Sequence, residues 1–124
     1  MQSVFGDLQF SVGWKTRGEI VLFGKTNNIT IKAKAYEETD GITDAQKLAF
    51  NDFKENTATR LNEAEAMLST IADGEPSRRF KPRTLLFNRS GEYALLCDDE
   101  SDPDDGVAVV LSPKQRVVSQ DDYL

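Results

Sequence analysis

Residues 43–74 read TDAQKLAFNDFKENTATRLNEAEAMLSTIADG, and this stretch decides the fold class. Thr43 and Gln46 are spaced as in a capping box, in which each side chain accepts a hydrogen bond from the other residue's backbone N–H. Small and apolar residues then recur at spacings of three and four: Ala49, Phe53, Thr57, Leu61, Ala64, Leu68 and Ile71. The pattern predicts one long helix ending at Asp73–Gly74, with a break near Asn56–Thr57 as the alternative.

Three strands are predicted before this helix. The first covers Leu8–Trp14, because apolar residues alternate there with small or polar ones: Leu8, Phe10, Val12 and Trp14. A second run, Glu19–Phe23, and a third, from about Asn28 to Tyr36, flank Gly24–Lys25. Glycine readily adopts the positive φ that tight turns need, so this junction predicts a hairpin.

Four strands are predicted after the helix, at Arg83–Phe87, Tyr93–Cys97, Val107–Leu111 and Arg116–Ser119. Turn-forming residues separate the first two strands and also the last two. The resulting order is β-β-β-α-β-β-β-β. The sequence therefore predicts an α+β fold with a mainly antiparallel sheet and the helix packed on one face.

The length and composition are those of one globular domain. The 124 residues suffice for one core, and 39% hydrophobic with 29% charged residues is ordinary for a folded protein. The first residues lack the basic and apolar segments of a secretion signal, and no apolar run approaches the roughly 20 residues that span a bilayer. We therefore expect a cytoplasmic protein that does not enter a membrane, and we draw no expectation about its oligomeric state.

The negative charge is concentrated in one short segment. Of the 21 acidic residues, six lie in positions 98–105 with no basic residue among them: Asp98, Asp99, Glu100, Asp102, Asp104 and Asp105. The remaining acids equal the 15 lysines and arginines in number, so the net charge of −6 is numerically that of this segment. Such a segment repels nucleic acid and attracts a basic protein, so we predict partner binding by these six residues and no contact with nucleic acid.

Two other interpretations of the acidic segment stay open. Runs of like charge are often solvated turns without a partner. Carboxylates are also ligands for calcium, but aligning Gly106 with the invariant glycine of the helix-loop-helix calcium motif places Pro103 at a ligand position. We therefore predict no metal site and no cofactor.

The chain contains no histidine, which excludes the commonest general base and every nucleophile pair that depends on an imidazole. Its one cysteine, Cys97, ends an apolar run and precedes acids that disfavour a thiolate, so we expect a structural thiol. We predict no catalytic residues and no enzyme activity. Catalysis by two carboxylates remains as a further hypothesis, which requires two acids converging in a pocket.

A basic segment lies directly before the fourth predicted strand. Ser77–Arg83 places four cations around Phe80, a combination that can hold a phosphate group or RNA. The alternative interpretation is a solvated loop that leads into the strand and binds nothing. Because acids elsewhere balance these cations, we favour the solvated loop.

Several short motifs resemble a bacterial family of small proteins of unknown function. They are Leu95–Asp98, Asp102–Val109 and Val117–Asp121 near the end of the chain, together with Gly13–Lys15 and Ile42–Thr43. The resemblance implies no activity, because the family has none assigned. In size and charge the chain is also similar to the immunity proteins encoded beside secreted bacterial toxins, each of which blocks one toxin domain.

Two binding hypotheses follow. In the first, the chain is an immunity protein that occludes a basic toxin domain with its acidic segment, since acidic binders are steered toward basic partners. In the second, it is a cytoplasmic interaction or regulatory domain without a toxin, and the acidic segment is a solvated turn.

Overall fold

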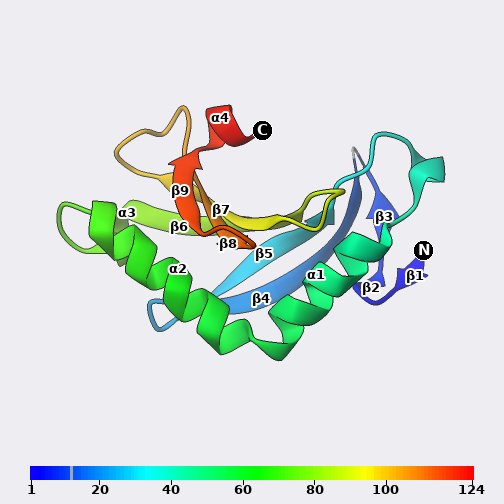
Figure 1. Ribbon diagram of the computed structural model, residues 1–124. Helices are drawn as coiled ribbons and strands as arrows, with labels where there is room; N and C mark the ends of the chain where they lie inside the picture. The colour runs from blue at the N-terminus through cyan, green and yellow to red at the C-terminus, as the bar shows by residue number, and fades with distance from the viewer. Residues whose placement is uncertain (12) are drawn as a thin grey trace.

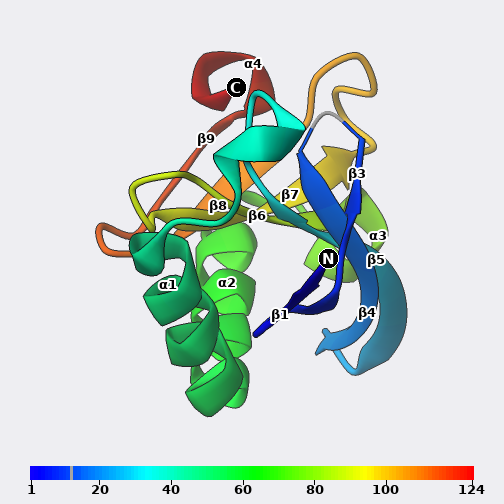
Figure 2. The same cartoon turned by 90° about the vertical axis from the view of Figure 1, so that its right-hand side faces the viewer.

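The computed structural model describes residues 1–11 and 13–124. Seven strands form one curved sheet in the order β3-β4-β5-β6-β7-β8-β9 (Figure 1). Within the described residues, every neighbouring pair is antiparallel except β5 with β6, which are parallel. Two helices, α1 (Asp44–Glu55) and α2 (Thr57–Ile71), cover one face of the sheet (Figures 1 and 2). The predicted α+β class and the mainly antiparallel sheet are confirmed.

The strands follow the predicted order, and all except β9 have bounds that differ from those predicted. They are β3 (Gln9–Phe10), β4 (Trp14–Leu22), β5 (Lys25–Ala33), β6 (Phe80–Phe87), β7 (Tyr93–Asp99), β8 (Val107–Ser112) and β9 (Arg116–Ser119). Two further short strands, β1 (Gln2–Ser3) and β2 (Gly6–Asp7), pair only with each other.

The predicted strand over Leu8–Trp14 is wrong. The chain reverses after Phe10, and Trp14 opens β4 and pairs with Phe10 across the turn. Gly13 has a φ of 117°, which few other residues adopt, and its carbonyl accepts a hydrogen bond from the Ser11 N–H at 2.8 Å. Val12, the third apolar residue of the predicted alternation, lies outside the described residues.

The predicted hairpin between the next two strands is confirmed, with its turn one residue earlier. Leu22 pairs with Lys25, so Phe23 and Gly24 form the two-residue turn. Both have positive φ, 52° and 74°, as the favoured hairpin turns require. The Glu65 carboxylate on α2 accepts a hydrogen bond from the Phe23 N–H at 2.7 Å, which fixes the turn against the helix layer.

The predicted helix is two helices, α1 (Asp44–Glu55) and α2 (Thr57–Ile71), divided at Asn56. One continuous helix was the wrong choice, and the alternative break is confirmed. The Asn56 side chain donates to the Asp52 carbonyl at 3.0 Å, an arrangement that competes with helical hydrogen bonding. Across the break, the Arg60 guanidinium holds the Asp52 carboxylate at 3.0 Å. The break at Asn56 therefore changes the direction of the chain, so that α1 and α2 both lie against the same face of the curved sheet.

The main core lies between the sheet and these two helices. The predicted stripe supplies Ala49, Phe53, Leu61, Ala64 and Leu68 to it, whereas Ile71 is exposed. Aromatic rings dominate one end of this core, where Phe87 stacks on Tyr93 with ring centroids 5.0 Å apart. Central strands β7 and β8 are buried along most of their length, which explains why they read as nearly continuous apolar runs.

Three short helical segments complete the described chain: η1 (Glu38–Asp40), α3 (Pro76–Arg79) and α4 (Gln120–Tyr123). α4 lies on the sheet face opposite α1 and α2 (Figure 2), where Tyr123 packs against a small cluster around Ala94, Ala108 and Val110. Of the helices in the described part of the chain, none combines the length and apolar character needed to cross a membrane.

Candidate functional site

The structure divides the predicted acidic segment into two parts. Asp98 and Asp99 are the last two residues of β7, where successive side chains point to opposite faces. Glu100–Asp105 form the loop to β8. Glu100, Asp102 and Asp104 are exposed, and Asp105 is half-buried. The six predicted residues therefore have different surroundings and do not form one uniform patch.

Asp99 is buried, and its carboxylate is bonded to groups of the same chain. Its side chain is 5% exposed and accepts two hydrogen bonds from the Arg79 guanidinium, at 2.9 and 3.2 Å. The Ser101 N–H donates a third, at 2.9 Å. The hydrogen bonds from Arg79 hold the pKa of Asp99 below its ordinary value, and the Ser101 N–H lowers it further. Arg79 also donates to the Ile71 carbonyl at 2.9 Å, so the pair ties the end of α2 to β7.

Asp98 is also paired within the chain. Its carboxylate accepts a hydrogen bond from the Arg83 guanidinium at 2.6 Å, on a surface where both side chains are more than half exposed. Exposed ion pairs add little to stability, and a partner can replace one of their members. The sequence gives no sign of either pairing, because both arginines precede their partners by 15 residues or more.

Two aspartates near the end of the chain join the loop. The Asp121 N–H donates to the Asp105 carboxylate at 3.0 Å, and the Gln120 N–H donates to the Gly106 carbonyl at 3.0 Å. These contacts bring α4, with exposed Asp121 and Asp122, against the loop. We call the resulting set the acidic surface, and it consists of Glu100, Asp102, Asp104, Asp105, Asp121 and Asp122.

The acidic surface is held in a defined shape by its backbone. The Asp102 N–H donates to the Asp99 carbonyl at 3.0 Å, and the Asp105 N–H donates to the Asp102 carbonyl at 3.2 Å. At the end of the loop, the Gln120 side-chain amide donates to the carbonyls of Cys97 and Val107, at 2.8 and 3.3 Å. A loop fixed in this way loses little conformational entropy when a partner binds.

Gly106 is required where the loop meets β8, and replacing it with alanine should lower the free energy of unfolding by about 2 kcal/mol. Its φ is 125°, and an added Cβ would lie 2.7 Å from the Cys97 carbonyl oxygen. Gly74→Ala is the matched control, because its φ is 132° but a Cβ there would meet no atom within 4 Å. Urea unfolding measures both losses. Equal losses in the two variants would contradict the role of the close contact.

Cys97 and a metal site are the other candidates considered from the sequence. Cys97 is buried, and burial raises the pKa of its thiol to about 12, with a smaller contribution from the Asp98 charge. Within residues 1–11 and 13–124, no three His, Cys, Asp or Glu side chains are grouped so as to hold a metal ion. Cys97 thus has the structural environment that its sequence position predicts.

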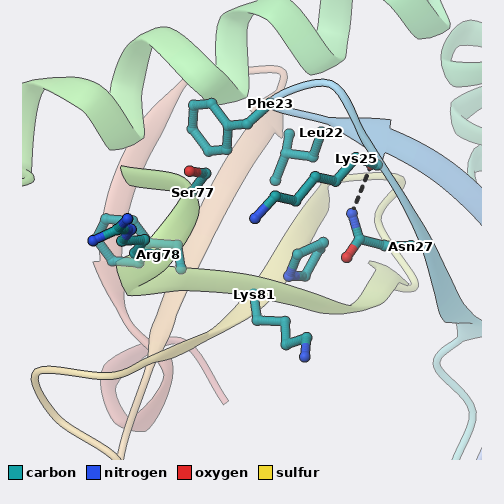
Figure 3. A pocket seen from close by; sticks show the side chains of 9 residues that line it. Leu22, Phe23, Lys25, Asn27, Ser77, Arg78 and Lys81 are labelled. Atoms are coloured by element: carbon teal, nitrogen blue, oxygen red, sulfur yellow. Dashed lines mark hydrogen bonds between the residues drawn. The ribbon is translucent and has the colours of Figure 1, made fainter. Parts of the chain in front are cut away.

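A separate cavity of about 230 Å³ lies between the β4–β5 hairpin on one side and α3 with the first residues of β6 on the other (Figure 3). Its apolar lining comes from Leu22, Phe23, Phe80 and Pro82. Its polar lining comes from Lys25, Asn27, Ser77, Arg78 and Lys81. The basic segment Ser77–Arg83 thus forms one wall of this cavity, and the hairpin, far away in sequence, forms the other.

Comparison of the chain with models of protein families, with curated proteins and with solved structures finds no match. The resemblance of its short motifs to a small bacterial family stays a prediction. What the chain does must therefore be inferred from its own residues.

Proposed function

We propose that this protein is a binding protein whose acidic surface attaches to a basic protein partner, and that the partner is a toxin domain which it neutralises by occlusion. One observation carries the proposal. The acidic surface gathers six carboxylates from two distant segments, and among the described residues none of the six forms an ion pair. Like charges held together repel one another, and a basic partner relieves that repulsion.

The proposal differs from the sequence-based prediction in its residues. Asp99 is excluded as a contact because it is buried against Arg79, whereas Asp121 and Asp122 are added. Asp98 contributes only if a partner displaces Arg83. The solvent-facing charge of the acidic surface is therefore carried by the loop and α4.

A second candidate is a cytoplasmic interaction or regulatory domain that has no toxin. The internal pairing of Asp98 and Asp99 favours it, because these two acids serve the fold or are already neutralised. In this case the loop is a solvated turn, and its charge has no role in partner binding.

The two candidates are separated by neutralising the loop. A variant with Glu100→Gln, Asp102→Asn, Asp104→Asn and Asp105→Asn should bind the toxin domain encoded beside the gene at least about 30-fold more weakly, because charged contacts are lost. Titration calorimetry of the purified proteins measures the change. Wild-type binding should also weaken between 50 and 500 mM salt, since salt screens exposed charges.

The matched control neutralises four exposed carboxylates elsewhere, at Glu19, Glu38, Asp44 and Glu55, and so changes the net charge equally. This control should retain binding within about threefold, because the charges lie outside the proposed contact. The absence of any complex at micromolar concentration would overturn the toxin proposal. Equal weakening in both variants would show that net charge alone matters and would contradict the assigned surface.

A further inference from the structure

The cavity in Figure 3 exists because the sheet divides between β5 and β6. These parallel strands pair only from Thr30 with Thr84 to Ala33 with Phe87. β5 begins earlier, at Lys25, and β6 begins at Phe80. The first halves of both strands therefore face each other without pairing, and the cavity lies between them.

The wall on the hairpin side is firmly held. The Phe23 N–H, in the turn, donates to the Glu65 carboxylate on α2 at 2.7 Å, and Leu22 is 2% exposed. On the opposite side, Phe80 is 2% exposed and lies under the Arg79 guanidinium at 4.8 Å. Both walls are thus anchored to the core, and the cavity between them has a defined shape.

The polar side chains at the cavity can all donate hydrogen bonds, and one of them, Arg78, already has an acidic partner. Figure 3 shows the Lys25 side chain extending over the cavity toward Ser77 and Arg78, whereas Lys81 points away. Among the described residues, Lys25 forms no ion pair, and Arg78 forms one with Glu75 at 3.3 Å on the open surface. In the part of the chain that the structure describes, no carboxylate lines the cavity, and the Glu65 carboxylate already accepts a hydrogen bond from the Phe23 N–H.

From this arrangement we infer that the cavity binds a small organic anion, one with a carboxylate or phosphate group on a compact apolar body. The anionic group contacts the Lys25 ammonium, the Ser77 hydroxyl and the Arg78 guanidinium, because charged donors form the strongest hydrogen bonds to oxyanions. The apolar body lies against Leu22 and Phe80, as in most small-molecule sites. This inference does not depend on the proposed function, although Arg78 and Lys81 also border Glu100 of the acidic surface.

Phenyl phosphate is the probe, because it combines both chemical parts in a size that suits a cavity of about 230 Å³. Titration followed by amide chemical shifts in the full chain should give a saturable change at Asn27, Ser77 and Arg78, with a Kd of about 1 mM. Lys25→Gln should weaken binding at least about tenfold, because a charged hydrogen bond is lost. Lys25 is exposed, so the variant should keep its fold.

Lys114→Gln is the control, since it removes the same charge from an exposed residue that does not line the cavity, and it should bind as the wild type does. Inorganic phosphate should bind more weakly than phenyl phosphate, because it lacks the apolar body. Shifts that never saturate up to about 20 mM, or equal affinity of the Lys25 and Lys114 variants, would overturn the inference. Equal binding of the two phosphates would overturn the role of the apolar lining.

Discussion

Replacing Gln46 with leucine should lower the free energy of unfolding by about 3 kcal/mol, because a buried side-chain amide loses three hydrogen bonds. Gln46 is fully buried although it is polar. Its amide donates to the Lys34 and Phe87 carbonyls at 3.0 and 3.1 Å, and its side-chain oxygen accepts from the Thr43 N–H at 2.9 Å. One side chain thus caps α1 and joins the helix to the ends of β5 and β6.

Urea unfolding measures this loss, and Asn51→Leu is its matched control. Asn51 lies on the same helix, is exposed and makes no side-chain hydrogen bond in the described structure, so its replacement should change the free energy by less than about 0.5 kcal/mol. A loss below about 1 kcal/mol for Gln46→Leu would show that the amide is dispensable and would contradict the joining role.

The second large effect is expected at Asp99. Asp99→Ala should destabilise the protein by about 3 kcal/mol at neutral pH, because it removes a buried carboxylate that accepts three hydrogen bonds. Asp98→Ala, which removes an exposed carboxylate paired with Arg83, is the control and should change stability by less than about 1 kcal/mol. Equal effects at the two positions would contradict the assignment of Asp99 as structural.

The effect of Asp99 should also depend on pH in a defined direction. Its pKa is lowered in the folded state, chiefly by the hydrogen bonds from Arg79, so folding favours the charged form. The stabilisation is therefore fully present above the unfolded pKa of about 4 and is lost as pH falls through the lower folded pKa. The free energy of unfolding, measured for the wild type and for Asp99→Ala at several pH values, should differ less between the two proteins below about pH 4. A difference that stays constant down to about pH 2 would contradict this origin of the stabilisation.

The sequence was most informative where contacts are local. The capping box of Thr43 and Gln46 was predictable because both partners lie within one helical turn, and the structure confirms it with hydrogen bonds of 2.9 and 3.0 Å. The last strand, Arg116–Ser119, was predicted with its observed bounds. The strand over Leu8–Trp14 failed because alternation alone does not reveal a reversal of the chain, which Gly13 permits.

The candidate sites also depend on contacts between residues that are distant in the sequence, and these contacts were not predictable. The acidic loop was visible as a run of charges, but the burial of Asp99 depends on Arg79, which lies 20 residues earlier. Asp121 reaches the loop only through the antiparallel pairing of β8 with β9. The cavity could not be predicted, because one wall is the β4–β5 hairpin and the other is α3 with the start of β6, which meet only in the folded chain.

The single parallel contact of the sheet also has a consequence for how the chain folds. On one side, β4 and β5 form a hairpin, and on the other, β6 to β9 form a continuous meander, so each block consists of contacts between neighbours in sequence. Within the described residues, the two blocks pair as strands along Thr30–Ala33 and Thr84–Phe87, and the Lys34 N–H adds a hydrogen bond to the Phe87 carbonyl at 2.9 Å. When β5 pairs with β6, the whole segment between them, which contains α1 and α2, is closed into a loop. The entropy lost by that long loop therefore opposes this pairing more than any other step of folding.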